Sequence, residues 1–340
     1  MTNKFSLKLS AIAVLIFLSS VSGQTANAAD KSYILTTATT GGTYYPVGVA
    51  IATLSKVKLQ PTKGLSLSAI SSAGSAENIK LLREKEAQLA ILQGIYAAWA
   101  ADGAGPLAAD GPQDHLRAIT TLWQNVEHFV VREQFATSGT MDDLKQLSGR
   151  SFSIGKRNSG AEGSGRFLLG ALGIPADDTF SLVFKGYGPS ADALQNGTIA
   201  GMNIPAGIPV SAVTRAYAGL GGKVRVLSFT DEHLAQANAK YNIYSRFVIP
   251  AGTYPNQEED IASVSMPNVL AVRADVPEED VYEITKAIFE NLAFLNNIHP
   301  ATKSISLDSA FDGLPLALHD GAARYFTEMD VPLPEAPTGE

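Results

Sequence analysis

The fold of this chain is decided by the stretch Thr39-Thr40-Gly41-Gly42-Thr43-Tyr44-Tyr45-Pro46-Val47-Gly48. The β-branched and apolar run at 33–37 before it predicts a strand. The apolar positions after Pro46 predict a helix, since proline favours a first helical turn. The glycine pair therefore lies at a strand-to-helix turn. Such a turn either serves tight backbone geometry alone or presents free N–H groups and a helix dipole to a small anion.

Two similar turns follow in the first part of the chain. Predicted strands at 65–71 and 89–92 end in polar residues around Gly74 and at Gln93, and each is joined to a neighbouring strand through a helical pattern. Repeated β-α-β units predict a parallel sheet, in which ligands bind beyond the carboxyl ends of the strands. The turns at Gly41, Gly74 and Gln93 are therefore expected to share one edge.

The pattern returns in the second half. A strand at 151–154 leads into the Gly- and Ser-rich turn 155–165, which contains Lys156 and Arg157. Arginine binds carboxylates through two parallel hydrogen bonds, so Arg157 is either a partner of an acidic ligand or a solvated surface residue. Two such halves predict an α/β fold of the two-domain, type II-like periplasmic binding-protein class. Its two parallel-core sheets would be joined by hinge strands, and a central cleft would close around a small solute.

The chain starts with the features of a secretory signal. Lys4 and Lys8 precede the apolar run 9–21, which is too short to span a bilayer, and an Ala-x-Ala site ends at Ala28. The expected organisation is a signal peptide, a first domain in two pieces around a second domain, and a flexible tail. The boundaries are 1–28 for the signal, 29–122 for the first part of domain 1, 123–246 for domain 2, 247–330 for the return segment that completes the hinge and domain 1, and 331–340 for the tail.

Composition narrows the function. With 45% hydrophobic and 17% charged residues, the 340-residue chain can bury two cores. Signal cleavage would remove two of the 26 basic residues and leave 24 against 33 acidic residues, a net charge of −9. Such an acidic chain disfavours nucleic acid as a partner. Cysteine is absent and the five histidines have no metal-ligand spacing, so neither metal nor cofactor is expected. A soluble, monomeric periplasmic protein is the expectation.

Several ordered blocks resemble one family of solute receptors. They include the Gly41-Gly42 turn, the run 75–82, Ala251-Gly252-Thr253-Tyr254-Pro255 and the run 314–322. In these blocks the chain resembles the TAXI family, the receptors of tripartite ATP-independent periplasmic (TRAP) transporters. The resemblance implies a receptor that delivers glutamate, glutamine or a 2-oxoglutarate-like acid to TRAP membrane subunits. The run 156–161 and Pro205 depart from the family pattern, which leaves the identity of the solute open.

The expected ligand-binding residues lie in the turns that follow strands in both halves. They are Thr40, Gly41, Gly42, Thr43, Tyr44, Tyr45, Ser72, Gly74, Ser75, Asn78, Gln93, Arg157, Asn158, Ser159, Gly160, Ala161, Tyr187, Asn203, Ala206 and Gly207. Tyr44 and Tyr45 diverge at a helix start, so one of them is expected to face the cleft. The chain has no nucleophile elbow, zinc-protease motif or Walker loop, which disfavours an enzyme. The alternatives are a receptor that serves a signalling partner or a periplasmic enzyme.

Overall fold

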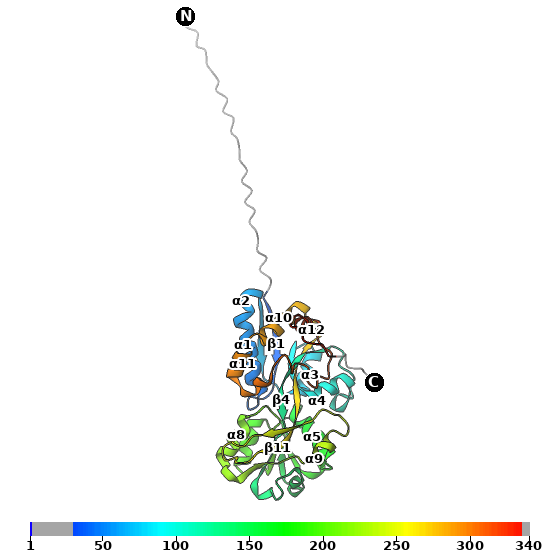
Figure 1. Ribbon diagram of the computed structural model, residues 1–340. Coiled ribbons are helices and arrows are strands. Elements are labelled where there is room, and N and C mark those ends of the chain that lie inside the picture. The colour runs from blue at the N-terminus through cyan, green and yellow to red at the C-terminus, as the bar shows by residue number, and fades with distance from the viewer. Residues whose placement is uncertain (2–29, 335–340) are drawn as a thin grey trace.

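The computed structural model describes residue 1 and residues 30–334. The predicted signal peptide 1–28, apart from Met1, lies outside the described residues, as does 335–340 of the predicted tail. Among the helices described, none combines the length and apolarity needed to cross a bilayer. Figure 1 shows two lobes, one above the other, with the N-terminal strands and the C-terminal helices in the upper one.

The first sheet supplies the core of lobe 1 and is parallel at its centre. Its strand order is β10-β11-β3-β1-β2, and β4 also pairs with β11. β1 pairs in parallel with β2 and β3, whereas β11 pairs antiparallel with β3, β4 and β10. The strands are β1 (Lys31–Thr36), β2 (Leu65–Ile70), β3 (Leu89–Gln93), β4 (Leu116–Val126), β10 (Ser245–Ile249) and β11 (Ile261–Arg273).

The second sheet supplies the core of lobe 2 and has the order β7-β6-β8-β5-β9. β6 pairs in parallel with β7 and β8, and β5 runs antiparallel to β8 and β9. The predicted class, two parallel-core α/β sheets, is therefore confirmed. The strands are β5 (Phe129–Arg132), β6 (Ser151–Ser153), β7 (Ser181–Val183), β8 (Gly201–Asn203) and β9 (Val224–Val226).

Two long strands connect the lobes. β4 leads almost directly into β5, and the start of β11 reaches lobe 2, where Phe229 N donates to Ala262 O at 2.7 Å. In Figure 1, β11 runs between the two lobes beside β4. The predicted boundary at 122/123 falls within β4 and that at 246/247 within β10. The chain therefore crosses between the lobes along paired strands, which is the geometry of a hinge.

Helices cover both faces of the two sheets. α10 shows why they form where they do: Pro277 precedes it, acids fill its first turn, and Val281, Ile284 and Ile288 are buried on one side. The helices are α1 (Tyr44–Lys58), α2 (Gln60–Lys63), α3 (Ser75–Arg83), α4 (Gly94–Asp102), α5 (Gly160–Ala171), α6 (Ala176–Thr179), α7 (Tyr187–Gln195), α8 (Ser211–Leu220), α9 (Asp231–Ala237), α10 (Glu278–Phe289), α11 (Leu292–Ile298) and α12 (Asp320–Glu328). Short 3₁₀ helices lie at Gly105–Leu107, Glu133–Phe135, Met141–Leu147, Gly221–Lys223 and Pro300–Ser304.

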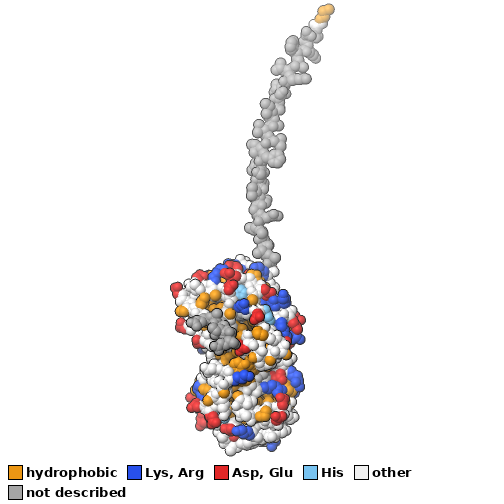
Figure 2. Space-filling view, turned by 90° about the vertical axis from the view of Figure 1, so that its right-hand side faces the viewer, with side chains coloured by type: hydrophobic (Ala, Val, Ile, Leu, Met, Phe, Trp, Pro, Cys, Tyr) orange, Lys and Arg blue, Asp and Glu red, His pale blue; other side chains and the backbone are white. Residues whose placement is uncertain are grey.

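The buried apolar side chains form clusters on the faces of the two sheets. One cluster includes Trp123 and Phe326 in lobe 1, and another includes Met202 and Tyr254 in lobe 2. Figure 2 shows acidic and basic side chains interspersed over both lobes on the face in view. A third cluster spans both lobes: it includes Trp99 of α4 and Phe152 of β6, so apolar packing joins the lobes beside the turns described below.

Candidate functional site

The turns of lobe 1 meet at the carboxyl ends of β1, β2 and β3. Asn78 of α3 holds this edge together from below: its Oδ1 accepts from Thr36 Oγ1 at 2.7 Å and from Ser72 Oγ at 2.6 Å. Its Nδ2 donates to the carbonyl oxygens of Thr37 and Ile91 at 2.7 and 2.9 Å. Asn78 therefore ties the ends of β1 and β3 to the turn after β2, and this fixes the relative positions of the three turns.

Lobe 2 presents a matching set of turns. Ser159 is the N-cap of α5, and its Oγ accepts from Glu162 N at 3.0 Å. The Tyr187 hydroxyl donates to Pro205 O at 2.6 Å, which joins the start of α7 to the segment after β8. Asn203 at the end of β8 donates from Nδ2 to Ala161 O at 3.0 Å. These bonds hold the ends of β6, β7 and β8 at one surface, as in lobe 1.

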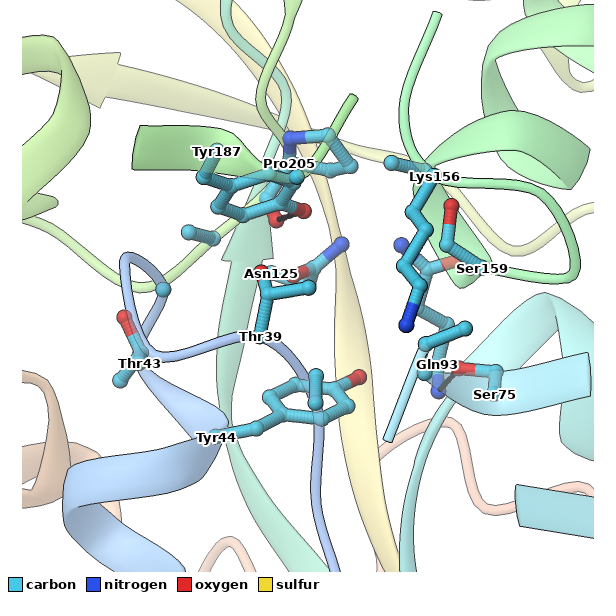
Figure 3. Close-up of a pocket in the computed structure, with 18 residues that line it drawn as sticks. Thr39, Thr43, Tyr44, Ser75, Gln93, Asn125, Lys156, Ser159, Tyr187 and Pro205 are labelled. Carbon is cyan, nitrogen blue, oxygen red and sulfur yellow. Dashed lines mark hydrogen bonds between the residues drawn. The ribbon is translucent and has the colours of Figure 1, made fainter. Parts of the chain in front are cut away.

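A cavity lies where the two sets of turns face each other, and Figure 3 shows it with its lining residues. It contains about 440 Å³ of space outside the atoms, its open mouth included. Both lobes contribute to its walls. The lining residues are Ala38, Thr39, Gly42, Thr43, Tyr44, Ala73, Gly74, Ser75, Gln93, Asn125, Lys156, Ser159, Gly160, Ala161, Gly186, Tyr187, Pro205 and Ala206.

The lobes touch each other around this cavity. Thr43 Oγ1 donates to Gly207 O at 2.9 Å, and Ser211 Oγ donates to Gly41 O at the same distance. On the other side, the α3 backbone is joined to the loop before α5 by a bond from Glu77 N to Asn158 O at 3.1 Å. Hydrogen bonds therefore cross the cleft on both sides of the cavity, and the structure is a closed form of the two lobes.

Five helices start at the cavity wall. The N-cap residues of α1, α3, α4, α5 and α7 are Thr43, Gly74, Gln93, Ser159 and Gly186, and all of them line the cavity. The first N–H groups of a helix have no partners within it, and the helix dipole places positive charge at this end. The convergence of helix N-termini from both lobes therefore makes the cavity favourable for an anion.

Lys156 adds a full positive charge. Among the described residues that line the cavity, it is the sole charged side chain, and within 30–334 no carboxylate lies in ion-pair range of it. Figure 3 shows its amino group directed toward Gln93 and Ser75 of lobe 1. A lysine held this way can bind a carboxylate as a point charge that reaches across the cleft.

Uncharged side chains supply the remaining polar groups. Gln93 Oε1 and both amide atoms of Asn125 are buried, and none has a hydrogen-bond partner among the described residues. By contrast, the Tyr44 hydroxyl donates to Asn268 Oδ1 at 2.5 Å, and burial raises the pKa of this phenol, so it stays neutral. Buried polar atoms are nearly always hydrogen-bonded, so Gln93 and Asn125 are available to a bound molecule.

Many of the residues predicted from sequence are brought together here. Tyr44 lines the cavity, whereas Tyr45 does not. The predicted residues that line it are Gly42, Thr43, Tyr44, Gly74, Ser75, Gln93, Ser159, Gly160, Ala161, Tyr187 and Ala206.

The other predicted residues lie around the cavity rather than in its lining. They are Thr40, Gly41, Tyr45, Ser72, Asn78, Arg157, Asn158, Asn203 and Gly207. The backbone carbonyls of Gly41, Asn158 and Gly207 accept the hydrogen bonds between the lobes described above. The Arg157 guanidinium stacks on the Phe184 ring, 3.6 Å from its centre, at an exposed position.

Seven lining residues were not predicted: Ala38, Thr39, Ala73, Asn125, Lys156, Gly186 and Pro205. Five of them are direct neighbours of predicted residues: Thr39, Ala73, Lys156, Gly186 and Pro205. Ala38 lies two residues before Thr40 in the same turn, so the sequence signal lies in the turns themselves. Asn125 stands apart, because it lies near the end of the long strand β4 rather than in a turn, and it reaches the cavity where β4 crosses between the lobes.

Comparison with solved structures gives the same architecture. The chain is similar to MatC (Rpa3494) from Rhodopseudomonas palustris with bound malate, with a TM-score of 0.53 and 15% identity over 88% of this chain and 98% of that one. It is also similar to the periplasmic binding protein BugD, with a TM-score of 0.50 and 13% identity over 87% of this chain and 94% of that one. At these identities the similarity shows the fold, which is that of two-domain periplasmic binding proteins.

A family model covers nearly the whole described chain. The model of the NMT1-like family matches residues 35–329, which include both lobes and every residue of the cavity lining. The chain belongs to the NMT1-like family.

Proposed function

We propose that this protein is a periplasmic solute receptor, of the TAXI type, that captures a small carboxylate between its lobes. The observation that carries the proposal is the convergence of five helix N-caps and Lys156 on one interlobe cavity. Anions are stabilised at helix N-termini and by the charge of a lysine. MatC, which has the same fold, was solved with malate, a dicarboxylate, which favours this class of ligand.

The solute we propose is glutamate or a C5 dicarboxylate such as 2-oxoglutarate. One carboxylate would lie against Lys156 and the N-terminus of α5, and the opposite end would face the turn after β1. The uncharged Gln93 and Asn125 between them offer both donors and acceptors. Closure of the lobes would then remove the ligand from water, as in other hinge-closing receptors.

A thermal-shift screen of amino acids and dicarboxylates tests the ligand class. A ligand at about 100 times its dissociation constant stabilises the folded protein by about 2.7 kcal/mol, so the unfolding temperature should rise clearly. Acids that match the cavity should produce this rise, and the corresponding neutral amides should not. An absence of any shift across the acids would overturn the anion proposal.

Delivery to TRAP membrane subunits is a separate part of the proposal and needs its own test. Proteoliposomes that contain the membrane subunits of a TRAP transporter should take up the identified acid when the receptor is present and an ion gradient is imposed. Lys156→Ala, which removes the amino group, should lower uptake to the same extent as it lowers the fraction of receptor that carries ligand. Uptake that is independent of the receptor would contradict delivery while leaving ligand binding intact.

A further inference from the structure

A buried carboxyl group lies beneath the cavity, where β4 passes into β5. Glu127 is 0% exposed, and neither of its carboxyl oxygens has a hydrogen-bond partner among residues 30–334. Its backbone is held on both sides: Glu127 N donates to Val264 O at 2.9 Å, and Ser263 Oγ donates to Glu127 O at 2.6 Å. The backbone at Glu127 is therefore fixed between the hinge strands, and its side chain is enclosed in the interior.

The strand geometry relates Glu127 to the cavity. Val126 and Ala206 exchange two backbone bonds of 2.9 and 3.0 Å, and Ile204 N donates to His128 O at 2.9 Å. The extended backbone of β4 thus continues through Glu127. Alternate side chains of a strand share one face, so Glu127 is on the same face as Asn125, which lines the cavity.

Other buried polar groups on this face also lack partners. Ser164 lies one helical turn after Ala161 on α5, and Asn203 is directly opposite Phe129 in the antiparallel pairing of β5 and β8. We call six side chains the polar floor. In the described chain they hold eight buried atoms without a hydrogen-bond partner: Gln93 Oε1, Asn125 Oδ1 and Nδ2, Glu127 Oε1 and Oε2, Ser164 Oγ, Asn203 Oδ1 and Tyr244 OH.

An ionised carboxylate is costly in this position. Taking a charge out of water costs several kcal/mol, and it is tolerated only where a counter-ion or several donors compensate. The polar floor has amide and hydroxyl groups but no cation. Burial accordingly raises the pKa of Glu127 to about 8, while the Ser164 hydroxyl acts in the opposite direction. At neutral pH the group is a carboxylic acid, which can donate one hydrogen bond.

The charged and titratable groups around Glu127 do not supply a counter-ion. Tyr44 of α1, Tyr187 of α7 and Tyr244 before β10 face it, and burial raises the pKa of all three, with Glu127 adding to the rise. On α5, Arg166 pairs with Glu162 at 3.5 Å and with Asp177. His128 is on the opposite strand face, where burial lowers its pKa to about 4.

Lys156 is the one cationic side chain among the described residues that line the cavity. It lies in the cavity wall, where Figure 3 shows it directed toward Gln93 and Ser75, and the segment after β8 presents the neutral Pro205.

We propose that Glu127 is a specificity-determining residue of the cleft: as the neutral acid it donates its hydrogen to the polar floor and orients the Asn125 amide, and its ionisation repels an anionic solute. The inference rests on the proposed binding of a carboxylate. Loss of the proton would place a negative charge in a dry interior next to the ligand. Affinity for an anion would therefore be highest at neutral pH, where Glu127 is protonated, and would fall as the pH rises and Glu127 loses its proton.

The titration itself is measured first, without ligand. Carboxyl-carbon NMR of the protein labelled at glutamate should show one signal with a midpoint near pH 8, against about 4.5 for an ordinary glutamate, and this signal should be missing in Glu127→Gln. The matched control Glu86→Gln removes an exposed carboxyl from the turn after α3 and should leave the signal in place. A Glu127 signal that titrates near pH 4.5 would overturn the proposal.

Calorimetry with 2-oxoglutarate and L-glutamate at pH 7 and pH 9 then tests the coupling. 2-Oxoglutarate has no group that titrates in this interval, so the protein sets any change. If binding requires the protonated acid, affinity falls about tenfold between these pH values in the wild type. Glu127→Gln keeps a neutral group of the same shape, so it should bind at pH 7 and lose the fall, whereas Glu86→Gln should retain it.

The outcomes separate the two proposals. An unchanged fall in Glu127→Gln would overturn the role of Glu127 while leaving carboxylate binding in place. If neither acid binds at any pH, the proposed ligand class fails and the coupling fails with it, and the NMR midpoint still decides whether the carboxyl is neutral. If Glu127→Gln does not fold, the wild-type midpoint and the wild-type affinity ratio carry the decision.

Discussion

At the scale of single residues, two adjacent cations in the loop before α5 have different surroundings. Lys156 lines the cavity and Arg157 stacks on Phe184. We expect Lys156→Ala to weaken binding of the carboxylate by about 1.5–3 kcal/mol, the usual worth of a hydrogen bond to a charged group. Calorimetry with the acid found in the thermal screen measures the loss. Arg157→Ala is the control and should leave affinity nearly unchanged. A larger loss in Arg157→Ala than in Lys156→Ala would show that Arg157, and not Lys156, binds the carboxylate.

Gly42 is constrained by the other lobe. A Cβ atom added there would lie 3.1 Å from two ring carbons of Tyr187, which is closer than ordinary packing allows. Gly42→Val should therefore keep the lobes from closing and weaken ligand binding more than tenfold, while the ligand-free protein still folds, because the clash involves the closed form. Gly170→Val is a suitable control, since nothing lies within 4 Å of its added Cβ. Equal affinity in the two variants would contradict this role for Gly42.

At the scale of elements, the sequence predicts best where a strand is followed by a turn and an amphipathic helix. β1 with α1 and β6 with α5 follow from the quoted turns, because glycine, proline and capping residues mark them. α4 could not be found this way. Its residues from Gly94 to Ala100 are all buried, so the helix has no polar face and its sequence lacks the period on which helix prediction depends.

The candidate site shows the same limit. The turns could be predicted because each follows a strand, and parallel strands place such turns at one edge. Which side chain of a turn faces inward depends on local backbone geometry: Asn158 has a φ of 61°, and Ser159 caps α5 just after it. Asn125 and Glu127 depend on the crossing of β4 between the lobes, which is a long-range arrangement and leaves no mark in the local sequence.

The crossing strands are held by a buried histidine, and this gives a prediction at the scale of the hinge. His128 Nε2 and the Tyr254 hydroxyl are 2.7 Å apart, and Nδ1 lies 2.9 Å from Val126 O. Tyr254→Phe removes one partner and leaves a buried ring nitrogen unpaired, so the free energy of unfolding should fall by about 1–3 kcal/mol. Denaturant titration at pH 7 measures the change. Tyr241→Phe, in a half-buried tyrosine of the loop before β10, should change stability far less.

The same histidine gives the direction of the pH effect. Burial lowers the pKa of His128 to about 4 from 6.5, so the unfolded chain binds a proton that the folded hinge does not bind. The contribution of His128 to stability is therefore complete above about pH 6.5 and is lost as the pH falls toward 4. Glu127 acts in the opposite sense: its raised pKa makes stability fall as the pH rises from about 4.5 to about 8. Between about pH 4.5 and 6.5 the two effects oppose each other, so the hinge is expected to be most stable in this interval and less stable on either side of it.

At the scale of the whole molecule, the ligand and the closed form stabilise each other. The turns of each lobe are complete without the other, whereas the cavity exists only where both sets of turns meet. If the closed form is the one that holds the ligand, the apparent dissociation constant is the intrinsic constant divided by the fraction of closed molecules. Bonds that join the lobes away from the ligand should therefore change affinity through the open-closed equilibrium alone.

Ser211→Ala tests this coupling. Ser211 is exposed, does not line the cavity, and donates across the cleft to Gly41 O at 2.9 Å. Its loss should favour the open form by about 0.5–1.5 kcal/mol, so the dissociation constant should rise by up to about tenfold. Small-angle X-ray scattering should show a larger radius of gyration than the wild type without ligand and the same radius at saturation. Thr327→Ala removes a similar hydroxyl bond, 2.8 Å within α12, and should change neither quantity. If Ser211→Ala and Thr327→Ala behave alike, the bond from Ser211 contributes nothing to closure. Other contacts between the lobes would then set the equilibrium, such as those of Thr43 and Glu77 and the packing of Trp99 on Phe167.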